Sequence, residues 1–400
     1  MQQPLLTGKK RIESIDILRG IVMVIMALDH VRDYFHIAAN TDNPLNLATT
    51  TPLLFFTRWI THFCAPIFVF LSGTSVYLQS LRKTKKELSI FLIKRGLWLV
   101  FAELIIVSFA WSFNPHYDFV FLQVIWAIGI SMFLLGLVIQ LPFNLILVLG
   151  LVIVLGHNLL DIPESAPGFK AGLWWDLLHH ANFVVYPYMQ HHAVFLVYAF
   201  LPWTGLMMLG YCTGIFFTGK YTAGQRRKNL LMIGAVLILF FIITRFINVY
   251  GDPVPWNTQK NNLFTLLSFI NVNKYPPSLL YMSLIIGSAF LFLAFIEKVQ
   301  NSFTSIMVIY GRVPFFYYIL HIYLVHLLAV IAFFARGHSV ADITNTGTRF
   351  PFYFVVPGEG VSLTVVYIIW LAVVVALFPL CRWYNNYKTV HKEKWWLAYL

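Results

Sequence analysis

The chain has 400 residues, of which 59% are hydrophobic, 17% are aromatic and only 11% are charged, and its formal net charge is +12. About a quarter of the residues in a soluble domain are charged, so this composition excludes an ordinary soluble protein. The basic residues occur in short segments between apolar blocks, which indicates a basic face toward lipid headgroups and excludes a nucleic-acid-binding protein.

Apolar blocks of roughly 18 to 25 residues recur from end to end, and this is the length with which an α-helix crosses a bilayer. We therefore predict an all-α, polytopic integral membrane protein with ten spanning helices. In chain order these are residues 15–36, 52–80, 90–112, 119–140, 144–160, 193–217, 229–250, 278–297, 304–335 and 361–381.

The basic segments set the predicted orientation. The stretches "GKKR", "LRKTKKE", "QRRKN" and "YKTVHKEK" lie before the first block, after the second, after the sixth and at the end of the chain. The positive-inside rule places all four in the cytoplasm, and an even number of spans agrees with this. Cytoplasmic tails 1–14 and 382–400 then flank one transmembrane domain, residues 15–381, whose longer outer loops roof a cavity.

The first predicted helix is unusually polar. Its stretch "DILRGIVMVIMALDHVRDYFH" carries seven ionisable side chains, each of which is costly in lipid. Arg19 and His30 are eleven residues apart, so they share one helical face and lie about 16 Å from each other along the axis. Arg19, at the inner end, is suited to bind a phosphate or a carboxylate, whereas His30 lies in the outer half.

The outer half of this helix has the residues of an acid/base site. Asp33 lies three residues after His30 and three before His36, so its carboxylate can reach either ring. A carboxylate on one ring nitrogen raises the basicity of the other, as a general base requires. Asp29 and Arg32 are spaced to form an ion pair. The alternative is a neutralising network at a helix end that touches water.

The second predicted helix carries Arg58 and His62 four residues apart near its outer end. The stretch "LSGTS" follows near its inner end, and small residues of this kind usually serve close helix packing. We expect these two polar side chains to take part in substrate or cofactor binding.

The ninth predicted helix supplies a second set of polar side chains in "YGRVPFFYYILHIYLVH". Arg312, Tyr317 and His321 form either a polar wall opposite the first helix or hydrogen bonds between helices. Tyr317 and His321 are four residues apart and can face one cavity. Pro314 allows a break in the backbone near Arg312.

We expect no metal site. The histidine pairs 179/180 and 191/192 have no neighbouring cysteine or glutamate ligands, and adjacent histidines on a helix point in different directions. The three cysteines lie in or beside apolar blocks without metal-ligand spacing, so we expect them to be buried and reduced. They are Cys64, Cys212 and Cys381.

With these residues identified, a family resemblance is visible. The stretch "RIESIDILRGIVMVIMALDHVRDYFH" resembles the opening helix of the membrane-bound acyltransferases related to heparan-α-glucosaminide N-acetyltransferase, particularly their shorter bacterial relatives. Supporting stretches are "APIFVFLSGTSVYL", "VIWAIGISM", "PWTGLMMLGY", "KYPPSLLYM" and "GRVPFFYYILHIYLVH". The spacing of Arg19 and His30 is also similar to that of the wider superfamily of integral-membrane sugar O-acyltransferases.

The resemblance implies transfer of an acetyl group from cytoplasmic acetyl-CoA to an amine or hydroxyl of a sugar or glycan on the far side of a bacterial cytoplasmic membrane. The local match of "DYFH" carries the catalytic role onto His36, whereas the wider superfamily's spacing places it on His30. The lysosomal relative has a luminal domain before its first helix, so a bacterial envelope glycan or a small amine is as plausible an acceptor as heparan.

These inferences give one expected site. The catalytic residues are His36, His30, Asp33 and Asp29. Substrate and cofactor binding is expected at Arg19, Arg32, Arg58, His62, Arg312, Tyr317 and His321, with the CoA phosphates among Arg19 and the basic loops around Lys83, Lys85 and Arg95.

The chemistry and the class of protein keep alternatives at this stage. The histidine either deprotonates the acceptor or is itself acetylated. The expected partners are acyl-CoA, the glycan acceptor and the bilayer, and a homodimer is compatible with them. The alternative function is a small-solute or proton-coupled transporter, in which the same buried charges would form a pathway.

Overall fold

The computed structural model describes residues 12–39, 41–343 and 352–398. It is mostly helical, with 69% of residues in helices and little sheet. Six helices are long and apolar enough to cross a membrane, and two shorter apolar helices accompany them. A polytopic helical membrane protein is therefore confirmed, while ten spans and two cytoplasmic termini stay predictions. The basic stretch "GKKR" lies outside the described residues.

The helices have the following bounds in chain order: α1 (Ser14–Phe35), α2 (Pro52–Trp59), α3 (Cys64–Ser80), α4 (Lys85–Ala102), α5 (Ser108–Ser112), α6 (Val124–Val138), α7 (Phe143–Gly156), α8 (Asp161–Glu164), α9 (Leu173–Trp175), α10 (Leu201–Thr213), α11 (Ala223–Ile247), α12 (Asn262–Ile270), α13 (Leu279–Ile296), α14 (Ser302–Arg312), α15 (Pro314–Ala335) and α16 (Leu363–Val390). The strands are β1 (Phe119–Leu122), β2 (Val184–Met189) and β3 (His192–Leu196). Short 3₁₀ or π turns continue several of these helices, for example between α2 and α3 and between α4 and α5.

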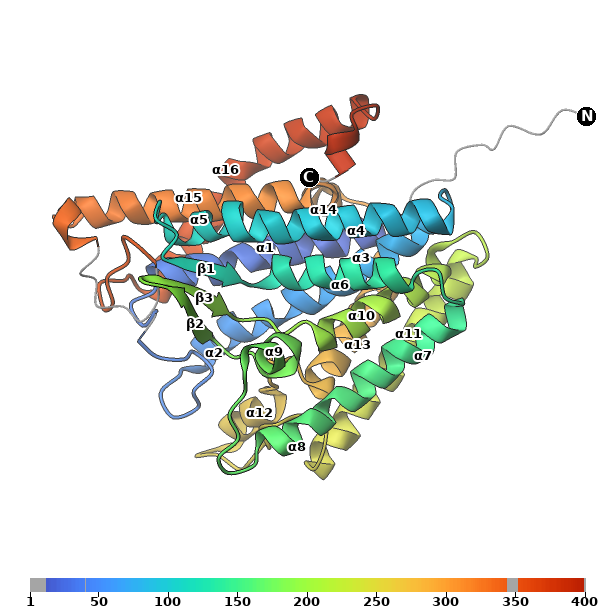
Figure 1. Cartoon of the computed structure of the whole chain (residues 1–400), viewed down its shortest axis with the longest axis horizontal. Helices are drawn as coiled ribbons and strands as arrows, with labels where there is room; N and C mark the ends of the chain where they lie inside the picture. The colour runs from blue at the N-terminus through green and yellow to red at the C-terminus, as the bar shows by residue number, and fades with distance from the viewer. Residues whose placement is uncertain (1–11, 40, 344–351, 399–400) are drawn as a thin grey trace, which may run out of the picture.

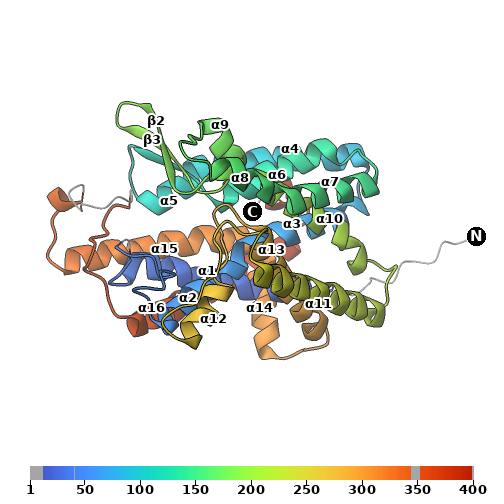
Figure 2. The same ribbon diagram turned by 90° about the horizontal axis from the view of Figure 1, so that it is seen from below.

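Most long helices run side by side, and the chain passes back and forth between two ends of the bundle (Figures 1 and 2). At the end where α1 finishes lie the three strands, α2, α9 and α12, and we call it the sheet end. The loops before α4, α7 and α11 lie at the other end, which we call the basic end. There Lys85 Nζ donates to the carbonyl of Gln140 (2.9 Å), and Arg226 pairs with Glu297.

The small sheet corrects two helix predictions. Its strand order is β1-β3-β2, with β1 parallel and β2 antiparallel to β3. Residues 119–122 and 193–196 were expected to begin spanning helices, but they are strands, and the helices start only at Val124 and Leu201. A short apolar run bounded by other elements fits either a buried strand or a buried helix, so its periodicity could not separate the two.

The predicted helix over residues 304–335 is two helices. Val313 has φ −128° and ψ 47°, and Pro314 then starts α15. A proline has no amide hydrogen to continue the helical ladder and is well suited to a first helical turn. The expected break near Arg312 is therefore confirmed, and α14 becomes a separate short helix that packs on α1.

The small residues of "LSGTS" let α3 and α10 approach closely. A Cβ on Gly73 would lie 2.1 Å from the carbonyl oxygen of Met207, and one on Gly210 would lie 2.1 Å from that of Phe70. Thr74 also donates to the carbonyl of Gly210 (3.0 Å). The prediction that this stretch serves helix packing is confirmed.

The hydrophobic core extends through the bundle and includes all three cysteines, which are free and buried as expected: Cys64, Cys212 and Cys381. A buried thiol in apolar surroundings behaves as a small hydrophobic side chain.

Candidate active site

A cavity of about 950 Å³ opens at the sheet end of the bundle. Its walls come from the last turns of α1, the start of the α2–α3 helix, β3, and the loops over residues 38–50 and 271–275. Most of the predicted catalytic and binding side chains line it, namely Asp29, His30, Arg32, Asp33, His36, Arg58 and His62. The fold thus brings the last turns of the first predicted helix and the first half of the second into one site.

His30 lines this cavity and is held in place by a side chain of α15. Its Nδ1 is 2.7 Å from Nε2 of His321, and the two rings stack with centroids 4.9 Å apart. Nδ1 of His321 is in turn 2.9 Å from the carbonyl oxygen of Tyr317. His30 therefore has a fixed orientation, and its ring partner is a histidine rather than Asp33.

The direction of these hydrogen bonds follows from chemistry. A carbonyl oxygen only accepts, so His321 carries its proton on Nδ1, and its Nε2 is an acceptor in the neutral ring. His30 must then donate from Nδ1, which leaves Nε2 of a neutral His30 as an unprotonated lone pair. Among the described residues, the His30 ring forms its hydrogen bond through Nδ1, and none is formed by Nε2. The result is a histidine presented as a base or a nucleophile at the cavity wall.

Aromatic side chains surround this pair. Trp111 meets His30 edge-on with centroids 4.8 Å apart, and Tyr318 also meets it edge-on at 6.3 Å. The ring of Tyr317 stacks on His321 at 5.1 Å. Tyr317 and His321 were expected to face the cavity, but they are fully buried behind His30, and Tyr318 takes the place at the wall. Tyr317 and His321 do lie on one face of α15, as their four-residue spacing predicted. The spacing could not show whether Tyr317 or the adjacent Tyr318 lines the cavity.

An ion network ties α1 to α2 at the floor of the cavity. Asp29 accepts from Arg32 (2.8 Å) through one oxygen and from Arg58 (2.5 Å) through the other. Arg32 also bonds Asp33 (2.6 Å). The predicted Asp29–Arg32 pair is confirmed. Contact of Asp33 with a histidine ring was the expected arrangement, but the two rings bind other groups, because Arg32 lies next to Asp33 and offers a stronger, charged donor.

His36 sits at the rim, just past the end of α1. Its backbone pairs with Val361, and its Nδ1 accepts from the amide of Ala38 (3.2 Å). A neutral His36 therefore holds its proton on Nε2, so the ring presents a donor to the cavity. His30 and His36 both line the cavity. In the neutral rings the proton is on Nδ1 of His30 but on Nε2 of His36, so of these two histidines His30 is the one whose Nε2 is a lone pair.

His62 differs from both. It is only 1% exposed, it lines the cavity, and neither ring nitrogen has a hydrogen-bond partner in the described chain. The 3₁₀ turn over residues 60–63 turns this ring toward the cavity, and Tyr281 holds its backbone through a 2.7 Å hydrogen bond. A buried polar ring without a partner indicates a place for a ligand or a water molecule.

The loop before α13 adds functional groups that the sequence did not reveal. Lys274 is 8% exposed and lies over the ring of Tyr275, and both line the cavity. Burial alone would raise the pKa of the Tyr275 phenol, but the positive charges of Lys274 and Arg58 bring it below its usual value. The sequence feature that could have pointed to this group is the lysine directly before "YPPS" at the start of a helix. That stretch was used only as support for the family resemblance.

Arg19 and Arg312 lie away from this cavity, toward the start of α1. Arg19 donates to Ser75 (2.9 Å) and to the carbonyl of Gly311 (3.2 Å). Arg312 pairs with Glu13 (3.3 Å) and lies 3.5 Å from Asp16. These bonds fasten α1 to α3 and α14. Arg19 and His30 lie toward different ends of α1, and the expected division into an inner anion-binding end and an outer acid/base end stays a prediction.

The first part of the chain matches a known protein family. The model described as heparan-alpha-glucosaminide N-acetyltransferase, catalytic, matches residues 11–249, which is more than half of the chain. This region includes Arg19, His30 and His62, and it ends before the loop of Lys274 and before α15, which carries His321. No curated protein matches the chain.

Proposed function

This chain belongs to the heparan-α-glucosaminide N-acetyltransferase catalytic family, and we propose that it moves an acetyl group from acetyl-CoA on the cytoplasmic side to an acceptor in the cavity at the sheet end. The family match supports acetyl transfer by a membrane protein. The gathering of the basic loops at the opposite end of the bundle supports the orientation, because the positive-inside rule places that end in the cytoplasm.

The observation that carries the proposal is the unprotonated Nε2 of His30 at the cavity wall. Nδ1 of His30 donates its proton to His321, so this proton stays on the ring. Nε2 of His30 is then able to accept a second proton. This is the arrangement that general-base catalysis needs. Trp111 and Tyr318 pack against the ring and restrict its rotation.

In the direct route the acceptor amine or hydroxyl gives its proton to His30 Nε2 while its heteroatom attacks the thioester carbonyl. The new C–N or C–O bond replaces the C–S bond, and the proton returns from His30 to the CoA sulfur as it leaves. In the second route Nε2 itself attacks, so that an acetyl-imidazolium forms, with Nδ1–H still donated to His321, and CoA thiolate leaves. The acceptor then displaces the neutral imidazole, and the proton that the acceptor loses goes to the CoA thiolate. Both routes use the same nitrogen.

The other expected site residues have supporting roles in this proposal. Asp29, Arg32 and Arg58 fix the ends of α1 and α2 on either side of the cavity, and Asp33 completes their ion network. His36, at the rim, and His62, at the wall, contact the acceptor. Their donors and acceptors suit the hydroxyl and amine groups of a sugar or a glycan.

The donor enters from the basic end. Arg19 and Arg312 stand near the start of α1, with Lys83, Lys85 and Arg95 on the neighbouring loop and helix, and together they suit an anionic CoA head. Lys85 already caps the end of α6 through the carbonyls of Gln140 and Leu141. Lys83 and Arg95 lie over the ring of Phe91.

Sided transfer tests the proposal. Purified protein is placed in liposomes with acetyl-labelled CoA outside and glucosamine, as a probe acceptor, inside, and protein facing either way is quantified by protease access to the basic end. We expect labelled N-acetylglucosamine inside and free CoA outside. Passage of intact labelled CoA without acetylation would instead indicate a transporter.

A further inference from the structure

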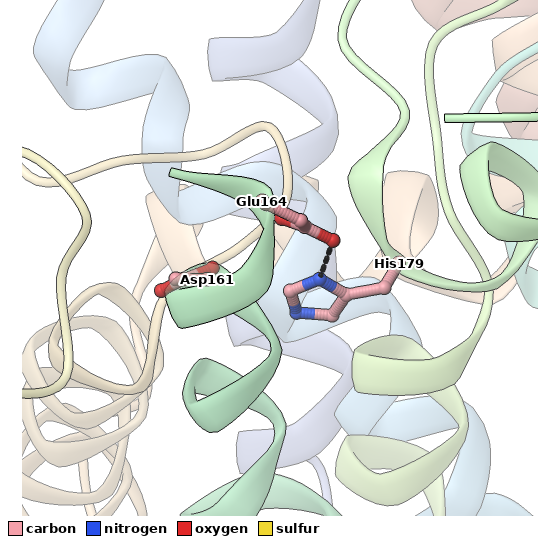
Figure 3. Close-up of side chains that lie close together, drawn as sticks. All are labelled: Asp161, Glu164 and His179. Carbon is pink, nitrogen blue, oxygen red and sulfur yellow. Dashed lines mark hydrogen bonds and ion pairs between the residues drawn. The ribbon is translucent and has the colours of Figure 1, made fainter. Parts of the chain in front are cut away.

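A second polar cluster lies outside the cavity, where the end of α7 meets the turn after α9. Asp161 and Glu164 project from one turn of helix, and His179 reaches them from the π turn over residues 176–180 (Figure 3). One ligand atom from each residue lies within 4.8 Å of the other two. The sequence indicated no metal ligands near His179, but the fold brings in two carboxylates, the nearer of them fifteen residues away in the chain.

The charges of this cluster do not balance. The charged groups that act on Asp161 are His179, Glu164 and Asp252. Asp252 has its own partner, because Arg245 lies 3.5 Å away. Among the described residues, no lysine or arginine forms an ion pair with Asp161 or Glu164, and the positive partner of Glu164 is His179 when that ring is protonated. A divalent cation would neutralise the pair.

The groups around the cluster hold its side chains in the manner of an outer coordination shell. Asn158 donates to Oδ2 of Asp161 (2.6 Å), and Trp175 donates to Oε1 of Glu164 (2.7 Å). Among the described residues, these bonds leave Oδ1 and Oε2 for an ion. Nε2 of His179 lies 3.1 Å from Nδ1 of His157, which can accept its proton. Metal-binding histidines and carboxylates are typically oriented by partners of this kind.

We propose that Asp161, Glu164 and His179 bind one divalent transition-metal ion of the Zn²⁺ type. Zn²⁺ binds both imidazole nitrogen and carboxylate oxygen, and three protein ligands leave its fourth position open, whereas Ca²⁺ and Mg²⁺ prefer oxygen ligands alone. On binding, Nδ1 of His179 releases its proton to solvent and gives its lone pair to the ion in place of its contact with Glu164 (2.8 Å). Binding therefore releases protons and weakens at low pH.

The ion would act as a clamp on the wall of the acetyl-transfer cavity. The π turn that carries His179 ends only two residues before Asn182 and Phe183, and both of these line the cavity. Asp161 and Glu164 belong to the helical run that continues α7. Joining the two segments through an ion fixes this part of the wall to the bundle, and it does so whether or not the protein transfers acetyl groups.

Metal content and thermal stability test the site without an activity assay. Protein purified through a tag without histidines is stripped with EDTA and titrated with ZnCl₂ at pH 7.5 in detergent. We expect one Zn²⁺ bound per chain and a higher melting temperature. Asp161→Asn and Glu164→Gln, which keep the shape of each side chain, should lose this binding. Trp175→Phe, which removes an outer partner, should weaken it about 10- to 100-fold.

The matched control is the double variant His191→Ala/His192→Ala, which removes the histidines at the turn of the β2–β3 hairpin. It should bind zinc as the unmodified chain does. The proposal is overturned if the folded, unmodified chain binds no stoichiometric zinc. It is equally overturned if both carboxylate variants bind as well as the unmodified chain, or if only the hairpin variant loses binding.

Discussion

His30 of α1 and His321 of α15 share a 2.7 Å hydrogen bond between ring nitrogens, across 291 positions of sequence. Because the carbonyl of Tyr317 fixes the proton of His321, this one bond decides which nitrogen of His30 is free. The relationship makes His321 a positioning residue for the base that we propose, although it does not itself line the cavity.

Replacing His321 by alanine should lower kcat for acetyl transfer and leave KM for acetyl-CoA unchanged, because the substitution disturbs the proton position of His30 and no donor contact. We expect a loss of roughly 10- to 100-fold, which is smaller than that for His30 itself. Initial rates of CoA release measure both constants. An unchanged kcat, or a rise in KM alone, would remove His321 from the mechanism.

His62 should affect stability and substrate binding in opposite directions. Its two buried nitrogens have no partners, so His62→Phe should keep or raise the melting temperature, since an apolar ring has no unmet hydrogen bonds. The same substitution should raise KM for the acceptor. His62→Gln, which restores a donor and an acceptor, is the rescue variant. A lower melting temperature together with an unchanged KM would show a purely structural role.

Asp29 should be essential to the floor of the cavity. Asp29→Asn weakens both ion pairs, removes the buried counter-charge of Arg58 and leaves Arg32 with Asp33 alone. Breaking a buried pair in this way costs roughly 3 to 5 kcal/mol, so we expect a clear fall in the melting temperature. Asp42→Asn is the control, because Asp42 lines the same cavity from an exposed loop. Equal melting temperatures for the two variants would contradict the role given to Asp29.

The crossing of α1 and α14 should not tolerate a methyl group. A Cβ on Gly20 would lie 1.9 Å from the carbonyl oxygen of Met307. Gly20→Ala must therefore push the helices apart, at a cost of about 1 to 3 kcal/mol. Gly224→Ala is the matched control in the first turn of α11, where a Cβ meets nothing within 4 Å and alanine favours the helix. Thermal unfolding in detergent compares the two, and equal stability would show that the crossing adapts.

Much of the helical framework was predictable because its signal is local. Blocks of apolar residues predicted most of the long helices, and Pro314 predicted the break before α15. The charged residues of the first helix were interpreted as a functional site because placing so many charges in lipid is energetically costly. Arg58 and His62 were predicted to bind substrate or cofactor, and the structure puts both at the cavity with His30, while their binding role stays a prediction.

What could not be predicted depends on contacts between distant segments. Nothing near His30 in the sequence indicates that its partner is His321 rather than Asp33. Lys274 reaches the cavity from a loop more than 200 residues away from α1. Asp161 and His179 come together only because the chain turns back between α8 and α9. Helical periodicity gives faces within one helix, but the pairing of faces is set by the packing of the whole bundle.

The most direct measurement compares acetyl transfer by His30→Ala and His36→Ala, with acetyl-CoA as donor, glucosamine as probe acceptor and CoA thiol release as the readout. Both variants are first shown to fold by gel filtration in detergent and to bind acetyl-CoA as the unmodified chain does. A lost general base costs about 10²- to 10⁴-fold, so we predict that loss for His30→Ala, whereas His36→Ala keeps most of its rate. Unchanged transfer by His30→Ala would contradict the central claim.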